Sequence, residues 1–135
     1  MYKEENNMTP NGYAAQAYRG IQVNTASPAE LTLMLYDGAI KFCNVAELGI
    51  DNNDILKAHT NIMKAERIIE ELRNTLDFKY EVANDFDRVY DYIYATLVEA
   101  NIKKDKEILE QALSAIREMR DTWKEVMKSN HLYVK

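Results

Sequence analysis

Apolar residues recur at helical spacing through four segments of this chain, which together span residues 27–128. A repeat of three to four residues is typical of an α-helix that buries one face. The 135 residues include only four glycines and two prolines, too few for the many turns of an all-β domain. The sequence therefore predicts an all-α fold, an antiparallel up-down four-helix bundle with short connections.

The first helix has a clear start. Ser27 is followed by Pro28 at the first helical position and by Glu30 at the third. Ser27 and Glu30 can exchange side chain–backbone hydrogen bonds in a capping box, and Pro28 lacks an N–H that would be unpaired there anyway. We predict a first helix from Pro28 to about Leu48, with its end near Gly49. Three further helices are predicted at about residues 55–76, 85–101 and 106–128.

Two segments flank the predicted bundle of residues 27–128: an extended N-terminal arm, residues 1–26, and a C-terminal tail, residues 129–135. The arm is mostly polar and shows no sustained helical period. It nevertheless carries four apolar groups of a kind that disordered segments usually lack: Tyr13, Tyr18, Ile21 and Val23. We predict that these groups hold the arm against the outside of the bundle.

The net charge of −5 weighs against some partners. An acidic chain without a basic stripe is a poor nucleic-acid binder and is repelled by anionic membrane surfaces. Its first residues, MYKEENN, do not resemble the basic and then apolar start of a signal peptide, and no apolar run is long enough to span a bilayer. We therefore expect a cytoplasmic protein with no nucleic-acid partner and no membrane insertion.

Candidate residues for chemistry are few. A di-iron bundle needs Glu-x-x-His pairs, and neither His59 nor His131 has a glutamate three residues before it. Cys43 is the only cysteine, and its place on an apolar stripe favours a small buried hydrophobe over a reactive thiol. With no phosphate loop or nucleophile motif either, the sequence predicts no catalytic, cofactor-binding or metal-binding residues, and no enzyme.

One alternative function uses the bundle shape itself. A histidine phosphotransfer domain carries one exposed histidine on a helix, and His59 is the candidate. Such domains place a lysine and a glycine shortly after the histidine, whereas the residues after His59 contain no glycine. This alternative stays open on the sequence, and phosphorylation by a sensor kinase would distinguish it.

The chain has more apolar residues than four inward stripes need. The first helix carries one stripe with Leu31, Met34, Leu35, Phe42 and Val45 and a second with Leu33, Tyr36, Ile40 and Cys43. The surplus over the four helices consists of Leu33, Ile40, Met63, Ile68, Tyr90, Tyr94, Leu113 and Met127. These residues either widen the core, lie scattered on the surface, or line a groove for an amphipathic segment. We predict the groove, formed by the first seven. Trp123 lies on the inward stripe of the fourth helix and is predicted to anchor the core.

The sequence also resembles a known family, the FliS-type flagellar secretion chaperones. The most specific resemblance lies in two stretches, Val23-Asn24-Thr25-Ala26-Ser27-Pro28-Ala29-Glu30-Leu31 and Met34-Leu35-Tyr36-Asp37-Gly38-Ala39-Ile40. Weaker matches follow at Leu76-Asp77-Phe78, Tyr90-Asp91-Tyr92-Ile93, Glu99-Ala100-Asn101 with Lys104-Asp105, and Met119-Arg120-Asp121-Thr122-Trp123. One departure is that Lys79, Tyr80 and Glu81 stand where family members often carry a Gly-Gly pair.

The resemblance implies a four-helix bundle that binds the disordered C-terminal segment of flagellin in the bacterial cytosol. It also implies that the chaperone prevents premature polymerisation and presents flagellin to the flagellar type III export gate. A disordered amphipathic partner orders only on binding, and a long apolar groove offsets that entropy cost. In the family the N-terminal arm can cover the groove when flagellin is absent. The resemblance thus implies a lid formed by Tyr13, Tyr18, Ile21 and Val23.

Overall fold

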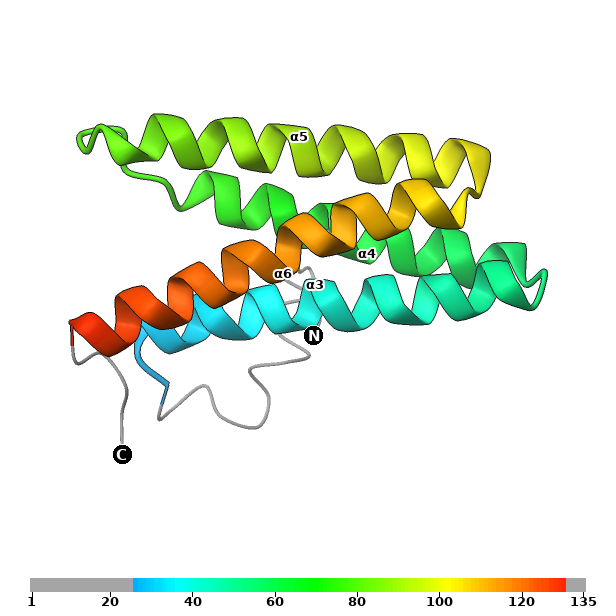
Figure 1. Ribbon diagram of the computed structural model, residues 1–135, viewed down its shortest axis with the longest axis horizontal. Coiled ribbons are helices and arrows are strands. Elements are labelled where there is room, and N and C mark those ends of the chain that lie inside the picture. The colour runs from blue at the N-terminus through cyan, green and yellow to red at the C-terminus, as the bar shows by residue number, and fades with distance from the viewer. Residues whose placement is uncertain (1–25, 131–135) are drawn as a thin grey trace, which may run out of the picture.

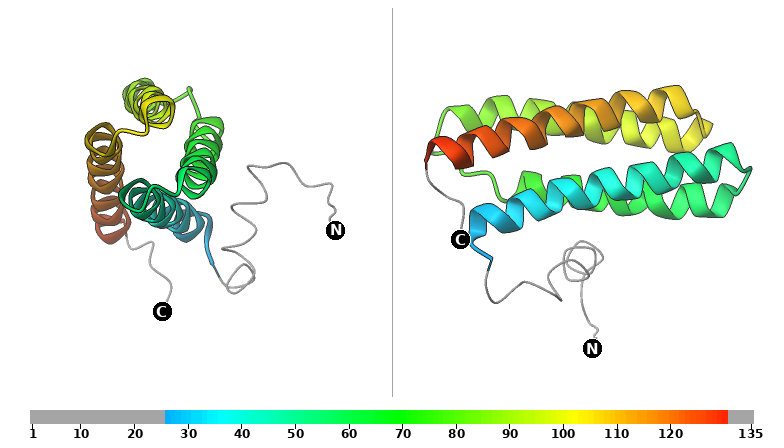
Figure 2. Two further views of the ribbon diagram at one scale, coloured as in Figure 1. Left: turned by 90° about the vertical axis from the view of Figure 1, so that its right-hand side faces the viewer. Right: turned by 60° about the horizontal axis from the view of Figure 1, so that its bottom comes forward.

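The computed structural model describes residues 26–130, which form four α-helices and no strand (Figure 1). The helices are α3 (Pro28–Asp51), α4 (Ile55–Asn74), α5 (Val82–Lys103) and α6 (Lys106–Ser129). Consecutive helices run in opposite directions, and each packs against the helices before and after it, with α6 closing the ring against α3 (Figure 2). The prediction of an all-α four-helix bundle is confirmed.

Local sequence signals explain where three of the helices begin. The Ser27 hydroxyl accepts a hydrogen bond from the Glu30 backbone N–H at 3.1 Å, and the Glu30 carboxylate accepts one from the Ser27 N–H at 3.0 Å. This is the predicted capping box of α3. The carboxylate of Asp54 caps α4, and that of Asp105 caps α6, each by accepting from backbone N–H groups of the first turn. These bonds satisfy donors that a helix start leaves unpaired.

The two largest differences from the predicted boundaries lie at the end of α3 and at the start of α5. Helix α3 continues past Gly49 to Asp51, because Gly49 serves close packing and does not end the helix. A Cβ atom there would lie 2.8 Å from the backbone nitrogen of Ala58 at the start of α4. Helix α5 begins at Val82, three residues early, after a turn in which the Asp77 carboxylate accepts from the Lys79 N–H.

The core contains the second apolar stripe of α3. Tyr36, Ile40 and Cys43 are buried there, whereas Leu35 and Phe42 of the other stripe are only partly buried. The same core takes in the buried side chains that the other helices contribute: Ile62, Ile68, Ile69, Leu72, Tyr90, Ile93, Leu97, Leu109, Leu113 and Ile116. Burial raises the pKa of the Cys43 thiol to about 12, which fits the predicted small buried hydrophobe.

Candidate partner-binding pocket

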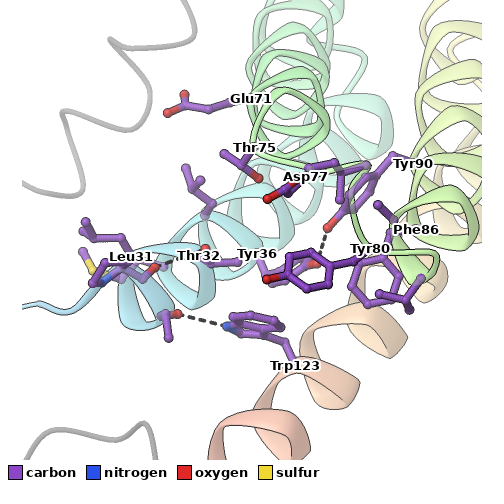
Figure 3. A pocket seen from close by; sticks show the side chains of 17 residues that line it. Leu31, Thr32, Tyr36, Glu71, Thr75, Asp77, Tyr80, Phe86, Tyr90 and Trp123 are labelled. Atoms are coloured by element: carbon purple, nitrogen blue, oxygen red, sulfur yellow. Dashed lines mark hydrogen bonds between the residues drawn. The ribbon is translucent and has the colours of Figure 1, made fainter.

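A cavity of about 650 Å³ lies at the end of the bundle where α3 and α5 begin and α4 and α6 end (Figure 3). Its lining is mostly apolar and comes from all four helices and from the connection at residues 75–81. The principal apolar side chains are Leu31, Leu35, Leu76, Val82, Phe86 and Trp123. A concave apolar surface of this size suits a few side chains of a bound segment.

The half-buried stripe of α3 forms one wall of this pocket. Leu31 and Leu35 lie one turn apart on that stripe, and they line the pocket together with residues at the end of α4. The C-terminal part of α6 holds the start of α3 in place, because the Trp123 indole N–H donates to the Ala29 carbonyl at 2.9 Å (Figure 3). The indole ring is partly buried against the core, as predicted for an anchor between helices, and it also lines the pocket.

The connection between α4 and α5 adds an exposed apolar rim. Tyr80 and Val82 line the pocket, although their side chains are 61% and 53% exposed. Phe78, in the same connection, is 55% exposed. Large apolar groups gathered at the mouth of an apolar cavity are typical of a binding surface rather than of scattered surface residues.

The polar groups of the pocket are few and placed at different depths. The hydroxyl groups of Tyr36 and Tyr90 form a hydrogen bond with each other across α3 and α5 (Figure 3). Both rings are buried, and burial raises the pKa of both hydroxyls, so they stay protonated and neutral near pH 7. Glu71 and Asp77 contribute carboxyl groups to the lining.

The structure places most of the predicted groove residues elsewhere. Four of the seven, Ile40, Ile68, Tyr90 and Leu113, are buried in the core, as is Met127. Predicting Ile40, Ile68 and Leu113 as groove residues was wrong, because a bundle helix faces two neighbours and buries more than one narrow stripe. Of the seven, Tyr90 alone lines the pocket, from below its surface.

The remaining three predicted groove residues are half-buried and lie on three different helices. Leu33 belongs to α3, Met63 to α4 and Tyr94 to α5, and none of them lines the pocket at the end of the bundle. The four predicted arm residues Tyr13, Tyr18, Ile21 and Val23 lie outside the described residues.

The residues that do line the pocket were assigned to the inward stripes or to the connection by the sequence pattern. Leu31, Leu35, Leu76 and Phe86 have the spacing of core residues, and Tyr80 stands in the link between helices. Their shared feature is position near a helix start or end, where an open bundle has no further layer to cover its core. That position, together with the aromatic groups of the connection, is the signal that the sequence offered.

Other candidate chemistry in the described residues is limited. The ring nitrogen Nδ1 of His59 is hydrogen-bonded to the side-chain amide of Asn101, which ties α4 to the end of α5. Within residues 26–130, no group of three or more His, Cys, Asp or Glu side chains converges as metal ligands would. None of the four described helices is long and apolar enough to cross a membrane.

The fold and the site define a small all-α protein, a four-helix bundle with an apolar pocket at one open end. Comparison with known proteins gives a specific family. The profile described as "Flagellar protein FliS" matches residues 10–130, and the chain belongs to the FliS family.

Curated relatives share this family. The flagellar secretion chaperone FliS of Bacillus subtilis (strain 168) is 42% identical over 113 residues, which cover 84% of this chain and 85% of the relative. The protein of the same name from Escherichia coli (strain K12) is 32% identical, with 90% and 93% covered. That from Campylobacter jejuni is 30% identical, with 86% and 92% covered.

Proposed function

We propose that this protein is a flagellar export chaperone that binds the disordered C-terminal segment of flagellin in the cytosol, prevents its premature polymerisation and delivers it to the flagellar type III export gate. The chaperone role rests on membership of the FliS family, whose curated relatives are named flagellar secretion chaperones. The observation that supports a binding role in this chain is the apolar pocket at the open end of the bundle.

We assign the contact surface to this pocket and not to the groove predicted from the sequence. An amphipathic segment can insert its apolar side chains between Leu35, Leu76 and Phe86, while the exposed rim at Tyr80 and Val82 covers them. Burying that surface offsets the entropy that a disordered partner loses on ordering. The role needs no catalytic group and no cofactor.

The N-terminal arm has a place in this proposal as a lid. The chain enters α3 at Pro28, and Pro28 and Ala29 already line the pocket, so the preceding residues are attached at its edge. An arm that occupies the pocket lowers the fraction of binding-competent molecules. Deleting residues 1–17 should then raise the association rate for a flagellin C-terminal peptide. Equal association rates for the truncated and full-length chains would remove the lid from the proposal.

A charge placed at the rim tests the pocket directly. Val82 is the first residue of α5 and is 53% exposed, so Val82→Asp adds a charge that suits a helix start and preserves the fold. We expect it to weaken binding of a flagellin C-terminal peptide about tenfold, because the charge must be desolvated in an apolar contact. Calorimetric titration with the full-length chain measures this loss.

Leu56→Asp is the matched control. Leu56 lies in the first turn of α4, is 74% exposed and stands at the opposite end of the bundle. Its variant should bind the peptide as the wild type does. Equal losses for both variants would argue against the pocket, and a wild-type chain that does not bind the peptide would contradict the proposed function itself.

A further inference from the structure

The floor of the apolar pocket carries one polar feature, the hydroxyl pair of Tyr36 and Tyr90. The two residues come from α3 and α5, 54 positions apart in the sequence, and their side chains are only 2% and 3% exposed. Figure 3 shows the two hydroxyls facing each other, joined by the dashed line. A buried polar group in an apolar cavity needs a partner for each of its donors.

The tyrosine pair has one more hydroxyl proton than its own hydrogen bond uses. Two neutral tyrosines bring two hydroxyl protons, and the hydrogen bond between them uses one. Among the described residues, neither hydroxyl has a hydrogen bond to any other group. Whichever tyrosine donates to the other, the second proton has no acceptor within residues 26–130 and lies at the floor of the pocket. An unpaired donor in this setting favours an occupant that brings an acceptor.

The surroundings restrict the chemistry of that acceptor. The pocket lining contains the carboxyl groups of Glu71 and Asp77, and no Lys, Arg or His among its described residues. A carboxylate on the bound segment would therefore enter an apolar, acid-lined site without a counter-charge, which is costly. A neutral acceptor, such as a backbone carbonyl or the amide oxygen of Asn or Gln, meets the donor at no such cost.

We propose that the Tyr36–Tyr90 pair is a specificity element, which donates one hydrogen bond to a neutral acceptor within the apolar segment that the pocket binds. The inference rests on the proposed function, since the occupant is the flagellin segment of the preceding subsection. It adds that apolar side chains alone do not complete the contact. A segment that places an acceptor among them is preferred over a purely aliphatic one, and over one with an acidic residue at that point.

The double variant Tyr36→Phe with Tyr90→Phe tests the assignment. Both rings remain, and replacing both partners of a buried hydrogen bond by apolar groups leaves the free protein about as stable as before, or more stable. The bound segment would then bury an acceptor without a donor. We expect affinity for a flagellin C-terminal peptide to fall about three- to tenfold, by calorimetric titration. Each single variant still offers one hydroxyl proton, as many as the wild-type pair leaves spare, so it should lose less affinity than the double variant.

Tyr92→Phe is the control, because Tyr92 lies on α5 but is 51% exposed and does not line the pocket. Its variant should bind as the wild type does. Unfolding by urea separates binding from stability: a pair that only fastens α3 to α5 would change the unfolding midpoint and leave the affinity of the folded chain unchanged. Wild-type affinity in the folded double variant overturns the inference and leaves the proposed function standing. If the wild-type chain does not bind the peptide, the proposed function is contradicted as well.

Discussion

Trp123 connects the end of the last helix to the start of the first, so its replacement tests how the pocket end of the bundle is held together. Its indole N–H donates to the Ala29 carbonyl at 2.9 Å, and its ring packs against the core. Trp123→Phe removes the hydrogen bond and keeps most of the ring contact. It should lower the free energy of unfolding by about 1 kcal/mol, the net contribution of one such bond.

Trp123→Ala removes the ring as well. Fully buried tryptophans cost about 3–5 kcal/mol on truncation to alanine. Because this ring is only partly buried and borders an open cavity, we expect roughly 2–4 kcal/mol, still a large share of the stability of a small domain. The pocket also loses one wall, so peptide affinity should fall in this variant even where the chain remains folded.

The measurement is urea unfolding followed by far-ultraviolet circular dichroism, because Trp123 is the only tryptophan and its loss removes the fluorescence signal. Hydrogen exchange should also rise first in the opening turns of α3, near Ala29. An alanine variant no less stable than the phenylalanine variant would show that the ring contact contributes nothing. Wild-type emission at the wavelength of a fully exposed indole would refute the packing on which the argument rests.

Three further predictions concern α3. Ser27→Ala removes the acceptor of the capping box and should cost about 1 kcal/mol, with faster amide exchange at residues 29–31. Gly49→Ala should cost about 2 kcal/mol or more in urea unfolding, because the new methyl group overlaps the Ala58 backbone by more than helix propensity can offset. Burial and the neighbouring Glu110 raise the pKa of Glu47 from 4.5 to about 7, so the folded chain holds a proton that the unfolded chain has released. Stability from this site should therefore fall as pH rises from about 5 to about 7.5, and Glu47→Gln should flatten that part of the profile.

Exposed residues of the same bundle supply the controls. Asn44→Ala on α3 is exposed and should change stability little, so a Gly49→Ala variant equal to it would contradict the close-packing argument. Glu118→Gln, exposed on α6, should leave the pH profile as it is. The same slope in Glu47→Gln as in wild type would mean that another group sets it, and unchanged exchange at residues 29–31 would count against the capping box.

Helices and their starts were predictable because their signals are local. A capping box needs only Ser27 and Glu30, three residues apart. Asp54 and Asp105 are likewise local signals, since an aspartate is a favoured N-cap residue. The ends were less predictable. A glycine such as Gly49 is common just after a helix end, and the sequence pattern predicts one there. Here it instead allows the backbone of Ala58 to pack closely against α3, a tertiary contact that the local sequence does not reveal.

The binding surface was predictable in kind but not in place. Counting apolar residues correctly indicated more apolar surface than four narrow stripes need. The groove residues predicted on α3, Leu33 and Ile40, come from its second stripe, whereas Leu31 and Leu35 of its first stripe line the pocket. Periodicity gives the angle between two stripes but does not show which stripe faces the neighbouring helices. Ile40 therefore lies in the core, while Leu31 and Leu35 reach the pocket.

The location of the pocket along the bundle follows from the connections. Helix α3 meets α4 through a tight turn at residues 52–54, just after Gly49, which packs against α4. The link from α4 to α5 is longer, spans residues 75–81 and carries Phe78 and Tyr80. A tight turn brings two helix ends together and closes the core between them, while a longer link lets the ends separate. The opening therefore lies at the end with the longer link, and its aromatic groups stand where a partner segment would enter. Shortening that link should close the pocket before it disturbs the opposite end of the bundle.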